Sequence, residues 1–145
     1  LKSAQEVHEK GLSFSDKAKE DLHNLTNALF EILDLTYDSF STNDVKKASS
    51  VEPLEQVIDR LVAEVKTSHI SRLQTGECTI EMGFVLSDLL NNYERVSDHC
   101  SNIAVTLIEV EQGSYDTHSY LNSVKDMSDE GFNNEYRKYK NKYLS

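Results

Sequence analysis

The sequence predicts an all-α protein, an antiparallel up-down-up bundle of three helices with a C-terminal helical extension. Three observations lead to this prediction. Apolar residues recur every three or four positions over three long stretches, the connections between them are short, and the chain contains a single proline. A length of 145 residues indicates one domain that is large enough to bury its own core.

The first helix is expected to follow a short lead-in. Residues 1–12 are mostly polar and Gly11 lies near their end, which indicates a linker or a frayed helical lead-in. Leucine and isoleucine residues at helical spacing then predict a helix from residue 13 to about residue 40. The polar run 41–44 ends this helix, and the carboxylate of Asp44 can cap the next one.

The second and third helices complete the predicted bundle. Pro53 interrupts the second helical pattern, so we expect a kink or a short break there. This helix ends at Gly76, and the third helix is expected over residues 79–111. Gly113 provides a residue that readily adopts the left-handed conformation found at helix ends. The predicted three-helix bundle therefore covers residues 13–113.

The third helix is expected to bury one face. Apolar residues recur there with spacings of 3, 4, 3 and 4, which places them on one side of an α-helix. These residues are Tyr93, Val96, Cys100, Ile103 and Leu107.

Residues 114–145 are predicted to form a polar, partly helical C-terminal tail with few buried positions. The last ten residues contain basic side chains and no acidic one. Two interpretations of this basic end stay open. The cations could complement the C-terminus of a helix, or they could contact an anionic membrane surface.

Charge and cysteine usage narrow the class of function. A net charge of -10 argues against a nucleic-acid partner, because such a partner requires a basic face, and cations are the expected ligands. Cys78 and Cys100 are too few for a disulfide framework and indicate a reducing compartment. Neither cysteine has a base and an orienting group around it, and the chain lacks a phosphate-cradling glycine loop. We therefore predict no catalytic residue and no enzyme activity.

Acidic pairs with a spacing of four occur on each predicted helix. Side chains four residues apart lie on the same side of a helix. If the second and third helices are neighbours, their four carboxylates could converge on one face, and an all-oxygen group suits magnesium, manganese, calcium or iron. The pairs are Asp34 with Asp38, Glu55 with Asp59, and Glu94 with Asp98.

The same pairs have a second interpretation. The chain contains 25 acidic residues, so pairs at this spacing also arise by chance. The carboxylates would then form a solvated face that Arg60 and Arg95 neutralise, and no metal ion would bind.

Three segments carry a resemblance to a known family. Residues 93–104, YERVSDHCSNIA, resemble the signature of the PhoU family, in which an E-x-x-x-D motif is followed by histidine and asparagine. Residues 51–61, VEPLEQVIDRL, are similar to the partner motif on the preceding helix. Residues 69–78, HISRLQTGEC, are similar to the PhoU-like domain at the C-terminus of bacterial sodium/phosphate cotransporters. The resemblance covers about residues 13–112.

This resemblance implies a three-helix bundle that regulates phosphate transport and holds metal ions on its surface. Carried over to this chain, the ligands are Glu55, Asp59, Glu94 and Asp98. Further ligands, or hydrogen-bond partners of the ligands, are expected to be Asn102, His99, Asp34 and Asp38. Iron is the preferred metal, and zinc, magnesium and manganese are alternatives. A domain that binds no metal is the remaining alternative.

The resemblance also implies partners and a location. The expected partner is a membrane transporter domain of the same protein, with the present domain on the cytoplasmic side of the plasma membrane. The chain begins at Leu1 rather than at a methionine, which is consistent with a piece of a longer protein. A homodimer is a further expectation. The alternative function is a metal-free helical adaptor that docks a partner protein through an exposed apolar edge.

Overall fold

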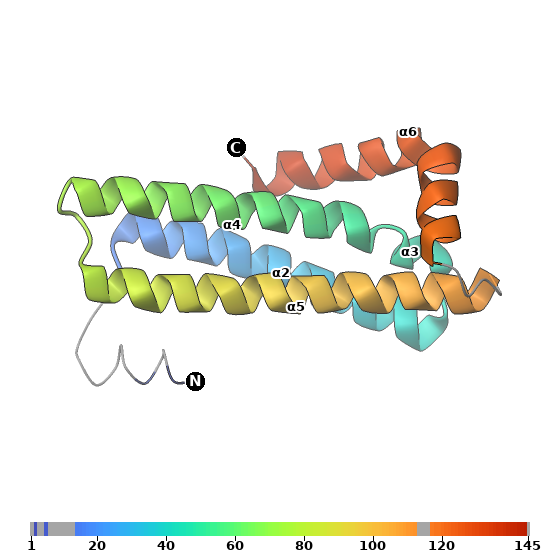
Figure 1. The fold of residues 1–145 in the computed structure, drawn as a ribbon, viewed down its shortest axis with the longest axis horizontal. Helices are drawn as coiled ribbons and strands as arrows, with labels where there is room; N and C mark the ends of the chain where they lie inside the picture. The colour runs from blue at the N-terminus through green and yellow to red at the C-terminus, as the bar shows by residue number, and fades with distance from the viewer. Residues whose placement is uncertain (1, 3–4, 6–13, 113–116, 145) are drawn as a thin grey trace.

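The computed structural model describes residues 2, 5, 14–112 and 117–144, and of residues 112 and 117–129 it describes the backbone alone. These residues form helices and no strand, which confirms the all-α prediction. Three long helices run up, down and up, and a further helix folds back along them (Figure 1). The helices are α2 (Asp16–Thr42), α3 (Val45–Ala48), α4 (Val51–Gln74), α5 (Ile80–Gln112) and α6 (Thr117–Tyr143).

Local signals set the ends of the first two helices. The hydroxyl of Ser15 caps α2 by accepting a hydrogen bond from the backbone N–H of Ala18 at 3.2 Å. Asn43 ends α2 in the left-handed conformation, with φ 51°. The carboxylate of Asp44 accepts a hydrogen bond from the backbone N–H of Lys47 at 3.1 Å, which confirms its predicted role as a cap.

The predicted interruption near Pro53 is a short break. α3 ends at Ala48 and α4 begins at Val51, so Pro53 lies in the first turn of α4, where its missing N–H leaves no helical hydrogen bond unmade. Gly76 follows α4 with φ 77°, as its predicted role in ending the helix requires. The predicted boundaries at residues 13 and 113, and the lead-in other than residues 2 and 5, lie outside the described residues.

The core lies among α2, α4 and α5 and is made of aliphatic side chains. Each large apolar side chain that is fully buried stabilises the fold by about 1.5–3 kcal/mol. The largest of those on these three helices are Leu25, Ile32, Leu54, Ile58, Leu86, Leu90 and Ile108.

The predicted buried face of α5 is right for Cys100 and Leu107 but wrong for Ile103, which is 44% exposed. The two small residues Ser97 and Ala104 are buried instead, at 0% and 3% exposure. Small side chains allow neighbouring helices to approach closely, so the contact face is rotated towards them. A prediction based only on the spacing of large apolar residues cannot detect this rotation.

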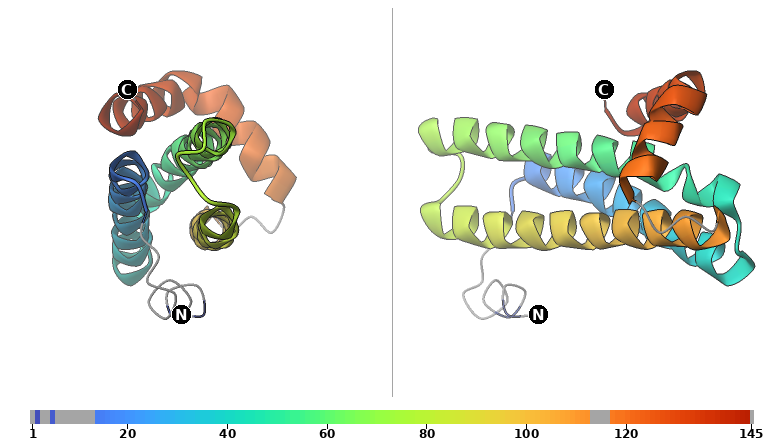
Figure 2. Two further views of the ribbon diagram at one scale, coloured as in Figure 1. Left: turned by 90° about the vertical axis from the view of Figure 1, so that its left-hand side faces the viewer. Right: turned by 45° about the vertical axis from the view of Figure 1, so that its right-hand side comes forward.

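The prediction of few buried positions in the tail is wrong for the end of α6. Viewed along the bundle, this end lies beside both α2 and α4 (Figure 2). Tyr139 and Tyr143 are only 4% and 7% exposed. The hydroxyl of Tyr143 donates to Glu31 at 2.7 Å, and its backbone carbonyl accepts from the side-chain amide of Asn24 at 2.7 Å. Lys142 binds Glu31 at 2.7 Å, so this cation pairs with α2 rather than serving only its own helix end.

A close contact joins α4 and α5 near the loop that connects them. His69 is 6% exposed, and its Nδ1 lies 3.4 Å from the thiol sulfur of Cys78. The imidazole faces Gly83 so closely that a Cβ atom there would lie 2.6 Å from Nε2. Burial, followed by the charge of Arg72, lowers the pKa of His69, so the neutral ring is favoured. A glycine at position 83 is therefore required for this packing.

Among the described helices, none combines the length and the apolar character needed to cross a membrane.

Candidate metal centre

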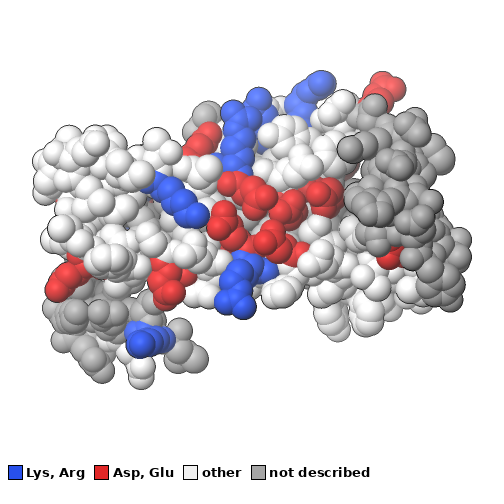
Figure 3. Space-filling view, viewed as in Figure 1, with Lys and Arg blue, Asp and Glu red and all other residues white. Residues whose placement is uncertain are grey.

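Three carboxylates from two helices come together between α4 and α5. Glu55 and Asp59 lie one turn apart on α4, and Asp98 faces them from α5. One carboxylate oxygen from each residue lies within 4.8 Å of the others. Figure 3 shows acidic side chains gathered at the centre of the face that these helices form, with basic side chains around them. The structure therefore brings together three of the four predicted ligands.

Glu55 is the most buried member of this carboxylate group, at 8% exposure. Burial, together with a hydrogen bond to Asp59 and nearby negative charge, raises the pKa of Glu55 to about 9. Burial also raises the pKa of Asp59, helped by the charges of Asp98 and Glu94, while the hydrogen bond with Glu55 opposes this increase. Without a cation, the raised pKa favours the protonated form of Glu55 at neutral pH.

Glu94, the fourth predicted ligand, lies outside the group. Its carboxylate is 3.4 Å from the ammonium of Lys66 on α4. The four-residue spacing does place Glu94 and Asp98 on the same side of α5, the side that faces α4. The direction of the Glu94 side chain is set by a basic residue that the motif does not include.

Glu52 is a neighbour of the group that the sequence analysis did not identify. It lies one turn before Glu55 on α4, and its carboxylate accepts a hydrogen bond from the hydroxyl of Ser101 on α5. The charge of Glu52 contributes to the raised pKa of both Glu55 and Asp59. The spacing of three between Glu52 and Glu55 is the signal that could have identified it.

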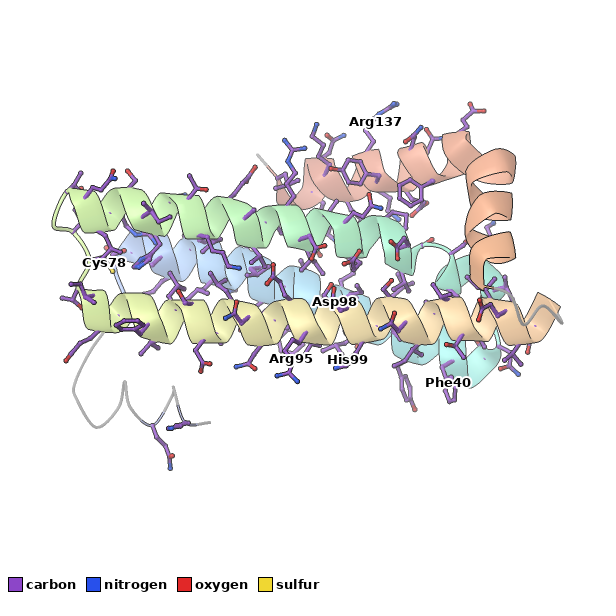
Figure 4. All side chains as sticks on the ribbon, in the orientation of Figure 1. Phe40, Cys78, Arg95, Asp98, His99 and Arg137 are labelled. Carbon is purple, nitrogen blue, oxygen red and sulfur yellow. The ribbon has the colours of Figure 1, made fainter. Side chains whose placement is uncertain are left out.

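The other predicted residues lie elsewhere. Asp34 and Asp38 are exposed on α2 and are not part of the carboxylate group. His99 and Asn102 line a groove on another side of α5. In Figure 4, Asp98 points towards α4, whereas His99 projects from the opposite edge of α5.

The two arginines expected to neutralise the acids are also placed elsewhere. Arg60 interacts with Glu64 at 3.8 Å, along its own helix. Arg95 projects from the same edge of α5 as His99, away from α4 (Figure 4), and it forms no ion pair within the described part of the chain. The excess negative charge at Glu55, Asp59 and Asp98 is therefore not balanced by these arginines.

The donor set fits a hard or borderline cation. All three candidate ligands offer oxygen, which suits magnesium, manganese, calcium and iron better than structural zinc. A cation there would relieve the repulsion among the three carboxylates, and it would favour the charged forms of Glu55 and Asp59, whose pKa values are raised by burial and by nearby negative charge. Three protein oxygens would leave further coordination positions for water or another ligand.

The fold and the carboxylate group together define a class of protein. It is an all-α bundle in which two neighbouring helices carry a cluster of acidic side chains. The chain belongs to the PhoU domain family, whose model matches residues 22–107, more than half of the sequence. This finding confirms the resemblance to the PhoU family, while the narrower resemblance to cotransporter domains stays a prediction.

One curated relative is the phosphate-specific transport system accessory protein PhoU homolog 1 of Thermotoga maritima. It is 22% identical over 94 residues, which cover 65% of this chain and 40% of the relative. The chain thus spans less than half the length of that protein. No solved structure matches the chain.

Proposed function

We propose that this chain is a regulatory domain in phosphate transport and that a metal ion bound by Glu55, Asp59 and Asp98 controls its conformation. Membership of the PhoU domain family and the name of the Thermotoga relative support the link to phosphate transport. The observation that carries the metal site is the approach of three carboxylate oxygens to within 4.8 Å of one another. The proposed role is regulatory rather than catalytic.

The transport system we propose is a sodium-dependent phosphate cotransporter. The resemblance of residues 69–78 to the C-terminal domain of such proteins supports this assignment. The domain would lie on the cytoplasmic side of the plasma membrane, and its partner would be the transporter domain of the same protein. Expression of the full-length gene product and measurement of sodium-dependent phosphate uptake, with and without this domain, would test the assignment.

The proposed mechanism depends on charge. Without a cation, Glu55 keeps a proton and the remaining acids repel one another across α4 and α5. Glu55, Asp59 and Asp98 would hold the cation, which would take the place of that proton and attract the carboxylates of both helices, so that the conformation with α4 and α5 close together would be favoured. We rank iron first, with zinc, magnesium and manganese as alternatives.

The test compares two variants that remove equal charge. Purified chain is dialysed without chelator, its metal content is measured, and its melting temperature is recorded with each cation and with EDTA. We expect Asp59→Asn with Asp98→Asn to abolish stoichiometric metal and the increase in melting temperature. The control, Asp34→Asn with Asp38→Asn, removes an exposed pair of the same spacing and should leave both unchanged. Equal metal content and melting temperature in all three proteins would disprove the metal site.

A second function, a metal-free helical adaptor, is favoured by a different observation. Several large apolar side chains on α2 are exposed to solvent, as expected for a protein-binding surface. Normal folding in EDTA together with an unchanged affinity for a partner would favour the adaptor over the metal-dependent regulator.

A further inference from the structure

A buried histidine and a cysteine meet where the chain passes from α4 to α5. Nδ1 of His69 lies 3.4 Å from the thiol sulfur of Cys78, nine positions later in the chain. His69 is 6% exposed, and its other ring nitrogen, Nε2, has no hydrogen-bond partner among the described residues. A buried polar atom without a partner is rare in folded proteins. This pair was not expected from the sequence, which shows no base beside either cysteine.

The loop between the two helices holds Cys78 in place. The backbone N–H of Glu77 donates to the carbonyl of Arg72 at 2.9 Å, so the loop is tied to the last turn of α4. The hydroxyl of Thr79 accepts a hydrogen bond from the backbone N–H of Met82 at 3.2 Å and caps the start of α5. The backbone is therefore restrained on both sides of the thiol.

A small cavity lies beside the pair. Its volume is about 90 Å³, and Glu77 lines it together with His69 and Cys78. A cavity of this size has room for a metal ion with about one or two water molecules. Much of the remaining wall is apolar and consists of Phe14, Ala18, Met82 and Leu86.

The distance between the sulfur and the nitrogen fits tetrahedral metal coordination. Zinc binds a cysteine sulfur at about 2.3 Å and a histidine nitrogen at about 2.0–2.1 Å. At a tetrahedral angle, these bond lengths place the two ligand atoms about 3.5 Å apart. Because the observed distance is 3.4 Å, one ion could bind both atoms with little movement of either side chain.

The chemistry of the side chains also suits a metal ion. Burial, followed by the charge of Arg72, lowers the pKa of His69, which favours the neutral ring that a metal requires. Thiolate and imidazole together select zinc rather than magnesium or calcium. Glu77 adds an exposed carboxylate that forms no ion pair within the described part of the chain.

We propose that His69, Cys78 and Glu77 form a metal site that binds a soft or borderline cation of the zinc class. His69 and Cys78 are the two ligands already in place. Within the described residues only the carboxylate group has three ligand atoms within 4.8 Å of one another, so Glu77 has to turn towards the pair. Water would take the fourth position. The bound ion would tie the end of α4 to the loop that precedes α5.

This site is separate from the carboxylate group. Figure 4 shows Cys78 at the end of the bundle where α4 and α5 are connected, whereas Asp98 lies nearer the middle of α5. The ligands differ as well, because the carboxylate group offers only oxygen and the new site offers sulfur and nitrogen. The presence of one site therefore does not depend on the other.

Substitution with cobalt(II) tests the site, because a bond between thiolate and cobalt produces a near-ultraviolet charge-transfer band that oxygen ligands do not. The reduced chain is titrated with cobalt and then with zinc. We expect the band to saturate at one equivalent, to disappear when zinc is added, and to be absent in Cys78→Ser. The matched control is Cys100→Ala, which removes the other free cysteine and should keep the band. Circular dichroism would verify that each variant folds.

Further variants test the other ligands. Glu77→Gln, at an exposed position, should raise the Kd for zinc severalfold, and His69→Gln should raise it about tenfold or more. Asp59→Asn with Asp98→Asn removes two members of the carboxylate group and should leave the cobalt band unchanged. The absence of the band in the original chain, or a band that persists in Cys78→Ser, would overturn the proposal. An unchanged Kd in Glu77→Gln would overturn the role of Glu77 as a ligand.

Discussion

The ammonium of Lys66 lies 3.4 Å from the carboxylate of Glu94, and this contact joins α4 to α5 beside the carboxylate group. It also explains why Glu94 is not the fourth member of that group. A cation bound by Glu55, Asp59 and Asp98 would have to compete with Lys66 for this carboxylate. The affinity of the site therefore depends on a residue that donates no ligand atom.

Replacing Lys66 with methionine should increase metal affinity. The substitution removes a positive charge near the site and leaves Glu94 free to turn towards it, so we expect Kd to fall by about three- to tenfold at low ionic strength. Isothermal titration calorimetry would measure this change. Glu94→Gln should cancel the gain in the Lys66→Met background, and an unchanged Kd in Lys66→Met would contradict the competition between Lys66 and the metal.

The stability of the metal-free chain should fall as pH rises. The pKa of Glu55 is raised from 4.5 to about 9 in the folded state, so the folded state binds the proton more tightly than the unfolded state. The associated stabilisation is fully present below pH 4.5 and is lost as pH approaches 9. We expect the free energy of unfolding to decrease by up to about 1.4 kcal/mol per pH unit within this window.

Urea unfolding in EDTA at pH 5, 6, 7 and 8 would measure this dependence. Glu55→Gln keeps a neutral, hydrogen-bonding side chain and should flatten the curve, so the variant should be more stable than the original chain at pH 8. If both proteins show the same slope between pH 5 and pH 8, another group is responsible.

Replacing Gly83 with alanine should destabilise the fold. The added Cβ would lie 2.6 Å from Nε2 of His69, whose ring is buried, so the ring or the helix would have to shift. We expect a loss of about 1–3 kcal/mol in the free energy of unfolding. A double-mutant cycle with His69→Ala provides the control, because removing the imidazole should make Gly83→Ala less costly. Additive effects would show that the contact does not limit the packing.

The end of α6 should contribute to the stability of the bundle. Tyr143 is 7% exposed and binds Glu31 through its hydroxyl, so Tyr143→Ala should lower the free energy of unfolding by about 3–5 kcal/mol. Tyr143→Phe, which removes only the hydrogen bond, should lower it by about 0.5–1.5 kcal/mol. Thermal or urea unfolding would measure both losses. The control is Phe84→Ala, which should change the free energy of unfolding little because Phe84 is 74% exposed. Equal stability of all these variants would mean that α6 is not part of the cooperative unit.

Most helix ends could be predicted because they depend on local chemistry. Asp44 and Gly76 act through their own backbone and their nearest neighbours, so a single sequence contains the required information. The buried state of the α6 end could not be predicted in this way. Tyr143 is buried by contacts with Asn24 and Glu31, which lie more than 110 positions earlier in the chain.

The sequence alone determined the helical class, the bundle and the placement of Glu55, Asp59, Glu94 and Asp98, because a period of 3.6 residues sets which side of a helix each residue lies on. Only the tertiary structure decided which of these side chains meet. Glu94 pairs with Lys66 and so does not join the carboxylate group. The face of α5 that packs against its neighbours contains the small residues Ser97 and Ala104, and Ile103 is left exposed. Periodicity assigns a residue to a face, whereas the rotation of one helix against another decides what that face contacts.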